Sequence, residues 1–188
     1  MKTGDHIDEA IDKVFLKEYE QALVQISIAI DGTSKRKYGS NGVAARMKKF
    51  VRDNETFITN TALNGQVTVS SDATTYSSLG KFDNVIYKVI RCPLLHGDDI
   101  SQHIVYLDEC RMGLDDGKFI VTPLLLWGLI FSVIGEVVNS TQILKKNHEV
   151  QVGGIDLNLN DFWGKMDKLK DALIERRQNR LSRNFHGS

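Results

Sequence analysis

The chain has 188 residues, 41% hydrophobic and 26% charged, which is the composition of one globular domain large enough to bury a core. Its 24 basic and 24 acidic residues balance, so overall charge gives no support to a nucleic-acid partner, and such a site must come from local clustering. Cys92 and Cys110 lack the CxxC spacing of a zinc site, and two cysteines exclude a disulfide framework. With an acidic, polar N-terminal stretch unlike a signal peptide, these features predict a cytoplasmic protein.

The first third of the chain has the periodicity of helices. Apolar residues recur every three to four positions from about residue 5 to 30, which predicts one helix ending near Gly32. A second helix is expected over residues 42–63, before the Asn64-Gly65 turn. The segment 66–76 fits a short strand or a loop.

The middle of the chain predicts a third helix over about residues 76–92, followed by a break or kink near Cys92 because Pro93 disfavours helical geometry at the residue before it. A hairpin insertion is expected near residues 102–122, around the Asp116-Gly117 turn.

After Pro123, an apolar fourth helix is expected to run to about residue 144. It is short for a membrane span and contains Glu136, so we expect it in the core and no membrane association. A second hairpin near 148–159 and a last helix over 161–183 complete the predicted elements. The predicted fold is mainly α, a single domain over residues 1–188 with a bundle of four to five helices and one or two inserted β-hairpins.

The stretch "IYKVIRCPLLHGD" places Arg91 and His96 five positions apart after an apolar helical stripe. Histidine titrates near neutral pH and can move protons, and arginine binds phosphate oxygens with a forked, permanently charged group. Together they can cleave RNA without a metal or another cofactor. The ordinary alternative is an arginine that favours a helix C-terminus, followed by a His-Gly turn.

An apolar helix that leads into Arg-x4-His-Gly resembles the HEPN superfamily, whose all-helical domains often act as ribonucleases. The resemblance covers residues 5–145 in outline. It implies that Arg91 binds and polarises phosphate and that His96 is the acid–base group. It also implies a homodimer in which two motifs line one composite cleft, cutting single-stranded RNA to leave a cyclic phosphate.

The same resemblance implies further site residues and a setting. Asp31, with Lys35 or Arg36, occupies the place of an acidic and a basic residue that face the site in some HEPN proteins, although a solvated helix end explains them equally well. Many members are toxins or serve in defence against viruses and plasmids, so an antitoxin or regulatory partner is expected.

Two departures from the family pattern leave alternatives open. Cys92, which falls in the predicted substrate-binding set, stands where active members commonly carry a polar residue, and a thiol is a poor hydrogen-bond partner. Asp98 stands where one toxin subgroup carries a tyrosine. The alternatives are a non-catalytic HEPN-like protein that binds RNA or protein as a scaffold, and an unrelated helical domain.

The C-terminal stretch "RLSRNFHGS" offers a rival pair, Arg180 and His186, which we set aside because chain ends are commonly disordered. The arginines after residue 175 favour a helix end more than an RNA-binding patch.

Overall fold

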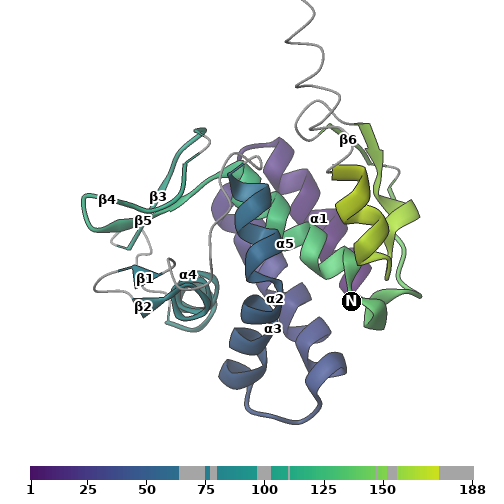
Figure 1. The fold of residues 1–188 in the computed structure, drawn as a ribbon, viewed down its shortest axis with the longest axis horizontal. Helices are drawn as coiled ribbons and strands as arrows, with labels where there is room; N and C mark the ends of the chain where they lie inside the picture. The colour runs from purple at the N-terminus through teal and green to yellow at the C-terminus, as the bar shows by residue number, and fades with distance from the viewer. Residues whose placement is uncertain are drawn as a thin grey trace, which may run out of the picture.

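The protein was analysed as a computed structural model, and it is mainly helical with a few short strands (Figure 1). The structure describes residues 1–63, 75–76, 80–96, 103–109, 111–146, 148–151 and 156–173; the side chains of 75–76 and 90–96 lie outside that description.

The first predicted helix is two helices, which corrects the single element expected over residues 5–30. α1 spans Thr3–Phe15 and α2 spans Tyr19–Tyr38. The chain turns at Lys17, which has a φ of 60°. This left-handed residue ends α1 and lets α2 fold back beside it, so that the apolar stripes of both helices are buried together. α2 continues through the predicted stop at residue 32 and ends at Gly39, whose φ is 74°.

α3 spans Val43–Ala62, close to its predicted range. α4 spans Phe82–His96 and therefore begins and ends later than the predicted helix over 76–92. Its start is delayed because the preceding residues pair as a small antiparallel ladder, β1 (Thr75–Tyr76) with β2 (Gly80–Lys81).

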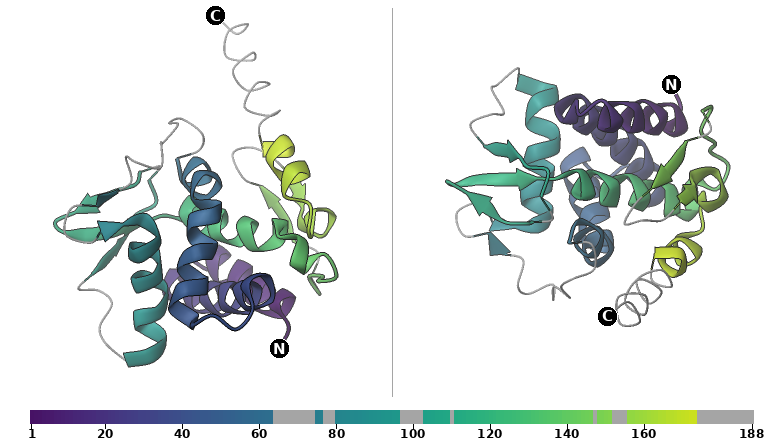
Figure 2. Two further views of the ribbon diagram at one scale, coloured as in Figure 1. Left: turned by 60° about the horizontal axis from the view of Figure 1, so that its bottom comes forward. Right: turned by 90° about the horizontal axis from the view of Figure 1, so that it is seen from above.

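α5 spans Pro123–Gly135 and runs through the middle of the molecule (Figure 2). The Thr122 side chain caps it by accepting a hydrogen bond from the backbone N–H of Leu125. From Leu125 to its end every side chain is buried, as expected for a helix that is apolar all round. It ends well before residue 144, because the backbone of Glu136 is extended. Across the described ranges, none of the helices is both long and apolar enough for a membrane span.

A three-stranded sheet precedes α5. β4 (Leu114–Asp115) and β5 (Lys118–Val121) form an antiparallel hairpin, and Asp116 and Gly117 have the positive φ angles of its two-residue turn. β3 (Ile104–Tyr106) runs parallel to β5 on its other edge, which the hairpin pattern did not indicate.

A third small sheet follows α5. After the 3₁₀ turn η4 (Val137–Asn139), strands β6 (Glu149–Gln151) and β7 (Asp156–Asn158) form the predicted antiparallel hairpin. The turn η5 (Leu159–Phe162) then leads into a helix that begins at residue 166, five positions later than predicted. The remainder of the predicted last helix, 174–183, lies outside the described residues.

The segment between η4 and β6 is tied to α1 by a buried acid. The carboxylate of Asp8 accepts the backbone N–H groups of Lys145 at 2.7 Å and Lys146 at 3.4 Å. It also lies 3.0 Å from Nε2 of His148. The side chains of Asp8 and His148 are 9% and 8% exposed. Their contact therefore holds the β6–β7 sheet against α1.

Candidate functional site

α4 carries the predicted catalytic residues on one uninterrupted helix. The helix does not end at Cys92, as the sequence predicted, but continues through Pro93 to His96. A proline inside a helix costs about 3 kcal/mol. Four buried apolar residues in the preceding turns anchor α4 against the core and offset this cost: Phe82, Val85, Ile86 and Val89.

A continuous helix also sets how the motif lies around its axis. Positions five residues apart are separated by about 140° at 3.6 residues per turn. The Cα atoms of Arg91 and His96 are therefore on different sides of α4. The side chains of Arg91, Cys92 and His96 lie outside the described part of the chain, so their catalytic and substrate-binding roles stay predictions.

Two contacts fix α4 on α3. Nη2 of Arg52 lies 2.5 Å from Oδ2 of Asp83, whose side chain is only 3% exposed. One turn further along α4, Nζ of Lys48 lies 5.2 Å from the ring centroid of Tyr87. Because the α3 partner moves back by four residues as the α4 partner moves forward by four, the helices are antiparallel. The second half of α4 is thus directed toward the first turns of α3.

Asp31 lies at that same end of α3, held by a residue that the sequence did not single out. Nη2 and Nε of Arg46 lie 2.5 and 3.1 Å from Oδ1 of Asp31. The Arg46 side chain is 9% exposed, whereas that of Asp31 is 40% exposed. Asp31 therefore presents a partly accessible carboxylate, already paired with a buried guanidinium.

The two basic residues predicted beside Asp31 have different surroundings. Lys35 is exposed on α2. Nη2 of Arg36 donates to Oγ1 of Thr3 at 2.7 Å and to Oδ1 of Asn139 at 2.5 Å. Burial of its guanidinium lowers the pKa of Arg36. Arg36 thus links α1, α2 and η4, while Asp31 is bound from α3.

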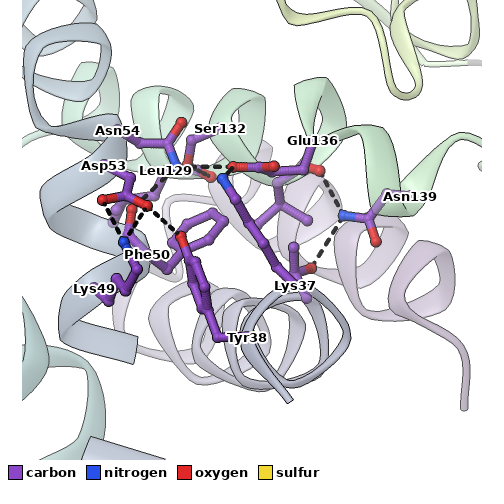
Figure 3. A network of polar contacts seen from close by, with 12 residues as sticks. Lys37, Tyr38, Lys49, Phe50, Asp53, Asn54, Leu129, Ser132, Glu136 and Asn139 are labelled. Carbon is purple, nitrogen blue, oxygen red and sulfur yellow. Dashed lines mark hydrogen bonds and ion pairs between the residues drawn. The ribbon is translucent and has the colours of Figure 1, made fainter. Parts of the chain in front are cut away.

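A polar network joins the C-terminal end of α2 to α3 and α5 (Figure 3). Nζ of Lys37 lies 2.5 Å from Oε1 of Glu136, whose side chain is 10% exposed. The same oxygen accepts a hydrogen bond from Nδ2 of Asn54 at 3.1 Å. Glu136 is the acid that the sequence placed inside an apolar helix. Its position one residue past the end of α5 lets a lysine of α2 reach it.

The neighbouring half of this network centres on Asp53. The Tyr38 hydroxyl donates to Oδ2 of Asp53 at 2.8 Å, and Nζ of Lys49 lies 3.0 Å from the same atom (Figure 3). Burial raises the pKa of Asp53, but the hydrogen bonds from Tyr38 and Lys49 outweigh it and hold the pKa below its ordinary value. Burial and the adjacent carboxylate raise the pKa of Tyr38, so its hydroxyl remains a donor. The i,i+4 spacing of Lys49 and Asp53 was the only signal of this pair in the sequence.

A pocket of about 250 Å³ opens beside this network, between α3 and the helix at 166–173. Figure 2 shows that helix and α4 on opposite sides of α3. The pocket can take a small molecule, but its mixed lining of acid, amide, hydroxyl, ammonium and apolar groups selects no one ligand class. It is lined by Asp53, Asn54, Thr56, Phe57, Asn60, Thr61, Lys170 and Leu173.

Within the described ranges, no three histidine, cysteine, aspartate or glutamate side chains lie close enough together to hold a metal ion.

Comparison with known proteins identifies one family. The model of the Rv1289 family matches residues 2–187. The chain belongs to the Rv1289 family. The matched range includes every described helix and strand and the Arg91–His96 segment. No curated protein and no solved structure matches the chain.

Proposed function

We propose that this member of the Rv1289 family is a HEPN-like, metal-independent endoribonuclease that cleaves single-stranded RNA with Arg91 and His96, in defence or stress. The observation that carries the proposal is the sequence Arg91-x4-His96-Gly97 at the end of α4, in a mainly helical chain. The partly exposed carboxylate of Asp31 supports it, because it lies at the end of α3 toward which α4 runs.

The proposed reaction is an internal transfer at phosphorus. His96 removes the proton of a ribose 2′-hydroxyl, and the 2′-oxygen forms a bond to the adjacent phosphorus. The bond from phosphorus to the 5′-oxygen of the next nucleotide breaks, and that oxygen takes a proton. Arg91 stabilises the negative charge that develops on the phosphoryl oxygens. The products are a 2′,3′-cyclic phosphate and a free 5′-hydroxyl, and no metal or external water takes part.

A composite site made by two copies of the chain fits the geometry of α4. The Cα atoms of Arg91 and His96 lie about 140° apart around the axis of one helix. Two copies that pack through their α4 helices would bring the arginine of one chain next to the histidine of the other. This arrangement is part of the proposal and calls for a homodimer.

The test is cleavage of a labelled single-stranded RNA in the presence of EDTA. We expect the unaltered chain to leave cyclic phosphate ends, and His96→Ala and Arg91→Ala to lose at least about 100-fold in rate, the usual contribution of one acid–base or charge-stabilising group. His103→Ala and Arg111→Ala are matched controls, because both residues are exposed and lie outside α4. Equal cleavage by all five proteins would mean that Arg91 and His96 are not the site.

Mixing the two inactive variants tests the composite site. If arginine and histidine act across the dimer, chains carrying Arg91→Ala and chains carrying His96→Ala regain cleavage when refolded together, and neither does so alone. A folded, dimeric parent chain that binds RNA without cutting it would instead favour the non-catalytic RNA-binding alternative, which the thiol of Cys92 beside Arg91 already suggests.

A further inference from the structure

The basic side chains of the α3–α4 pair and of the residue before α4 include Lys48, Arg52, Lys81 and Lys88. Lys48 and Arg52 come from α3, and Lys81 and Lys88 lie just before and within α4. Arg52, Lys81 and Lys88 are exposed, and Lys48 is half-buried. We call these four residues the α3–α4 basic face.

We propose that the α3–α4 basic face binds the phosphates of single-stranded RNA and leads the strand along α4 to Arg91. This inference rests on the proposed ribonuclease function for its direction, but the binding itself can be measured without cleavage.

Two of these cations, Lys48 and Arg52, are held in place by contacts between α3 and α4. The Lys48 ammonium sits over the ring of Tyr87, 5.2 Å from its centroid, which fixes a charge from α3 above α4. Arg52 is fixed by Asp83 at 2.5 Å, and this contact raises the pKa of Arg52. Positioned cations lose less conformational entropy on binding a phosphate than free ones do.

Three of these cations have no carboxylate partner among the described residues. Within the described residues, no carboxylate pairs with Lys48, Lys81 or Lys88, whereas lysines elsewhere, such as Lys37 and Lys146, are bound to one. A lysine without a carboxylate partner can bind a phosphate with no ion pair to break.

The acids on the same side are few and mostly occupied. Between residues 82 and 89 of α4 the one acid is Asp83, which is buried and bound to Arg52. Asp53 and Glu55 of α3 lie close enough to Arg52 to raise its pKa further, and Asp53 is itself bound by Tyr38 and Lys49. Four cations against these three carboxylates leave the face positive in a chain whose formal net charge is zero.

Two lysines of the basic face precede the predicted catalytic arginine along the chain. Lys81 ends β2 directly before the helix, and Lys88 lies within α4 seven residues later. Arg91 follows Lys88 by three residues, which places its Cα on the next turn. A phosphate backbone that follows the lysines thus reaches the position of Arg91.

Counterion release sets the expected size of the effect. For single strands, each phosphate neutralised contributes about 0.7 to the slope of log affinity against log salt. Removing three lysine contacts should reduce the slope by about 2, which corresponds to a loss on the order of 100-fold in affinity at 0.1 M salt relative to 1 M.

The experiment measures binding of a fluorescent 20-nucleotide oligouridylate by anisotropy over a range of salt concentrations. All proteins carry His96→Ala so that the RNA stays intact. The test variant adds Lys48→Ala, Lys81→Ala and Lys88→Ala. The matched control adds Lys2→Ala, Lys165→Ala and Lys168→Ala, which removes the same charge from exposed lysines near the N-terminus and on the last helix. A variant with arginine at the three test positions should bind as the parent does, and circular dichroism checks that each is folded.

The outcomes separate this inference from the proposed function. A weaker, flatter salt dependence in the test variant alone supports the basic face. If the test variant binds like the control, or the parent does not bind RNA, the inference is overturned. Cleavage by the unaltered chain in EDTA is scored separately. Cleavage without an effect of the three lysines leaves the ribonuclease proposal standing alone, and lysine-dependent binding without cleavage leaves only the basic face.

Discussion

α5 approaches the backbone of α3 closely at Gly128, and an alanine there tests that approach. A Cβ atom at this position would lie 2.9 Å from the carbonyl oxygen and 3.2 Å from the Cα of Ile58. Both neighbours are backbone atoms, which cannot move aside as a side chain can. We therefore expect Gly128→Ala to push the two central helices apart.

The expected change in the free energy of unfolding follows from two opposing effects. Alanine is favoured over glycine inside a helix by about 1 kcal/mol. Forcing an extra methyl group into a packed core costs about 1 to 3 kcal/mol. The net effect on the free energy of unfolding is a loss of about 0 to 2 kcal/mol for Gly128→Ala.

Gly32 provides a matched control inside α2. There the new Cβ would lie 3.4 Å from Oγ1 of Thr3 and 3.6 Å from an Arg36 nitrogen, which are side-chain atoms at ordinary contact distance. Only the propensity effect remains, so Gly32→Ala should stabilise the protein by up to about 1 kcal/mol. The two variants should therefore differ by about 1 to 3 kcal/mol.

The assay is urea denaturation of the two variants and the parent, followed by circular dichroism at 222 nm with unchanged m-values. If Gly128→Ala stabilises the protein as much as Gly32→Ala does, the close approach of α5 to α3 is refuted. Equal destabilisation by both would instead show that the α1–α2 contact at Gly32 is tighter than the distances indicate.

Two further predictions concern the carboxylates of Asp8 and Asp53. Asp8→Ala leaves Nε2 of His148 and two backbone N–H groups without their acceptor, so the free energy of unfolding should fall by about 1 to 3 kcal/mol. An unchanged midpoint of urea denaturation would contradict the contact. Because the folded pKa of Asp53 is lowered by Tyr38 and Lys49 despite burial, its contribution to stability is present above about pH 4 and lost as pH falls through the folded pKa. Carbon-13 NMR titration should show that low pKa, rising in Tyr38→Phe; an ordinary pKa in the parent would count against this hydrogen bond.

Helical periodicity located most helices because a helix that packs on a core must repeat its apolar residues every three to four positions. α3 and the start of α5 at Pro123 follow directly from such patterns. The periodicity did not reveal the turn at Lys17, since apolar residues recur every three to four positions in both α1 and α2. Only the packing of one helix against the other required the chain to reverse there.

The candidate site was predictable in part. The spacing of Arg91 and His96 is a property of the sequence alone, and the structure adds that both lie on one continuous helix. Arg46, which binds Asp31, was not predictable, because the two residues are fifteen positions apart on different helices. The network around Glu136 was hidden in the same way, since its partners come from α2 and α3.

The sequence by itself determined the mainly helical class, the two hairpin positions and the motif on which the ribonuclease proposal rests. Local preferences suffice for these, because turns, caps and apolar stripes act over a few neighbouring residues. The tertiary structure decided where helices end and which charges meet. Pro93 stays inside α4 because the buried stripe before it outweighs a local penalty. Lys48 and Arg52 meet Tyr87 and Asp83 only because α3 and α4 pack antiparallel.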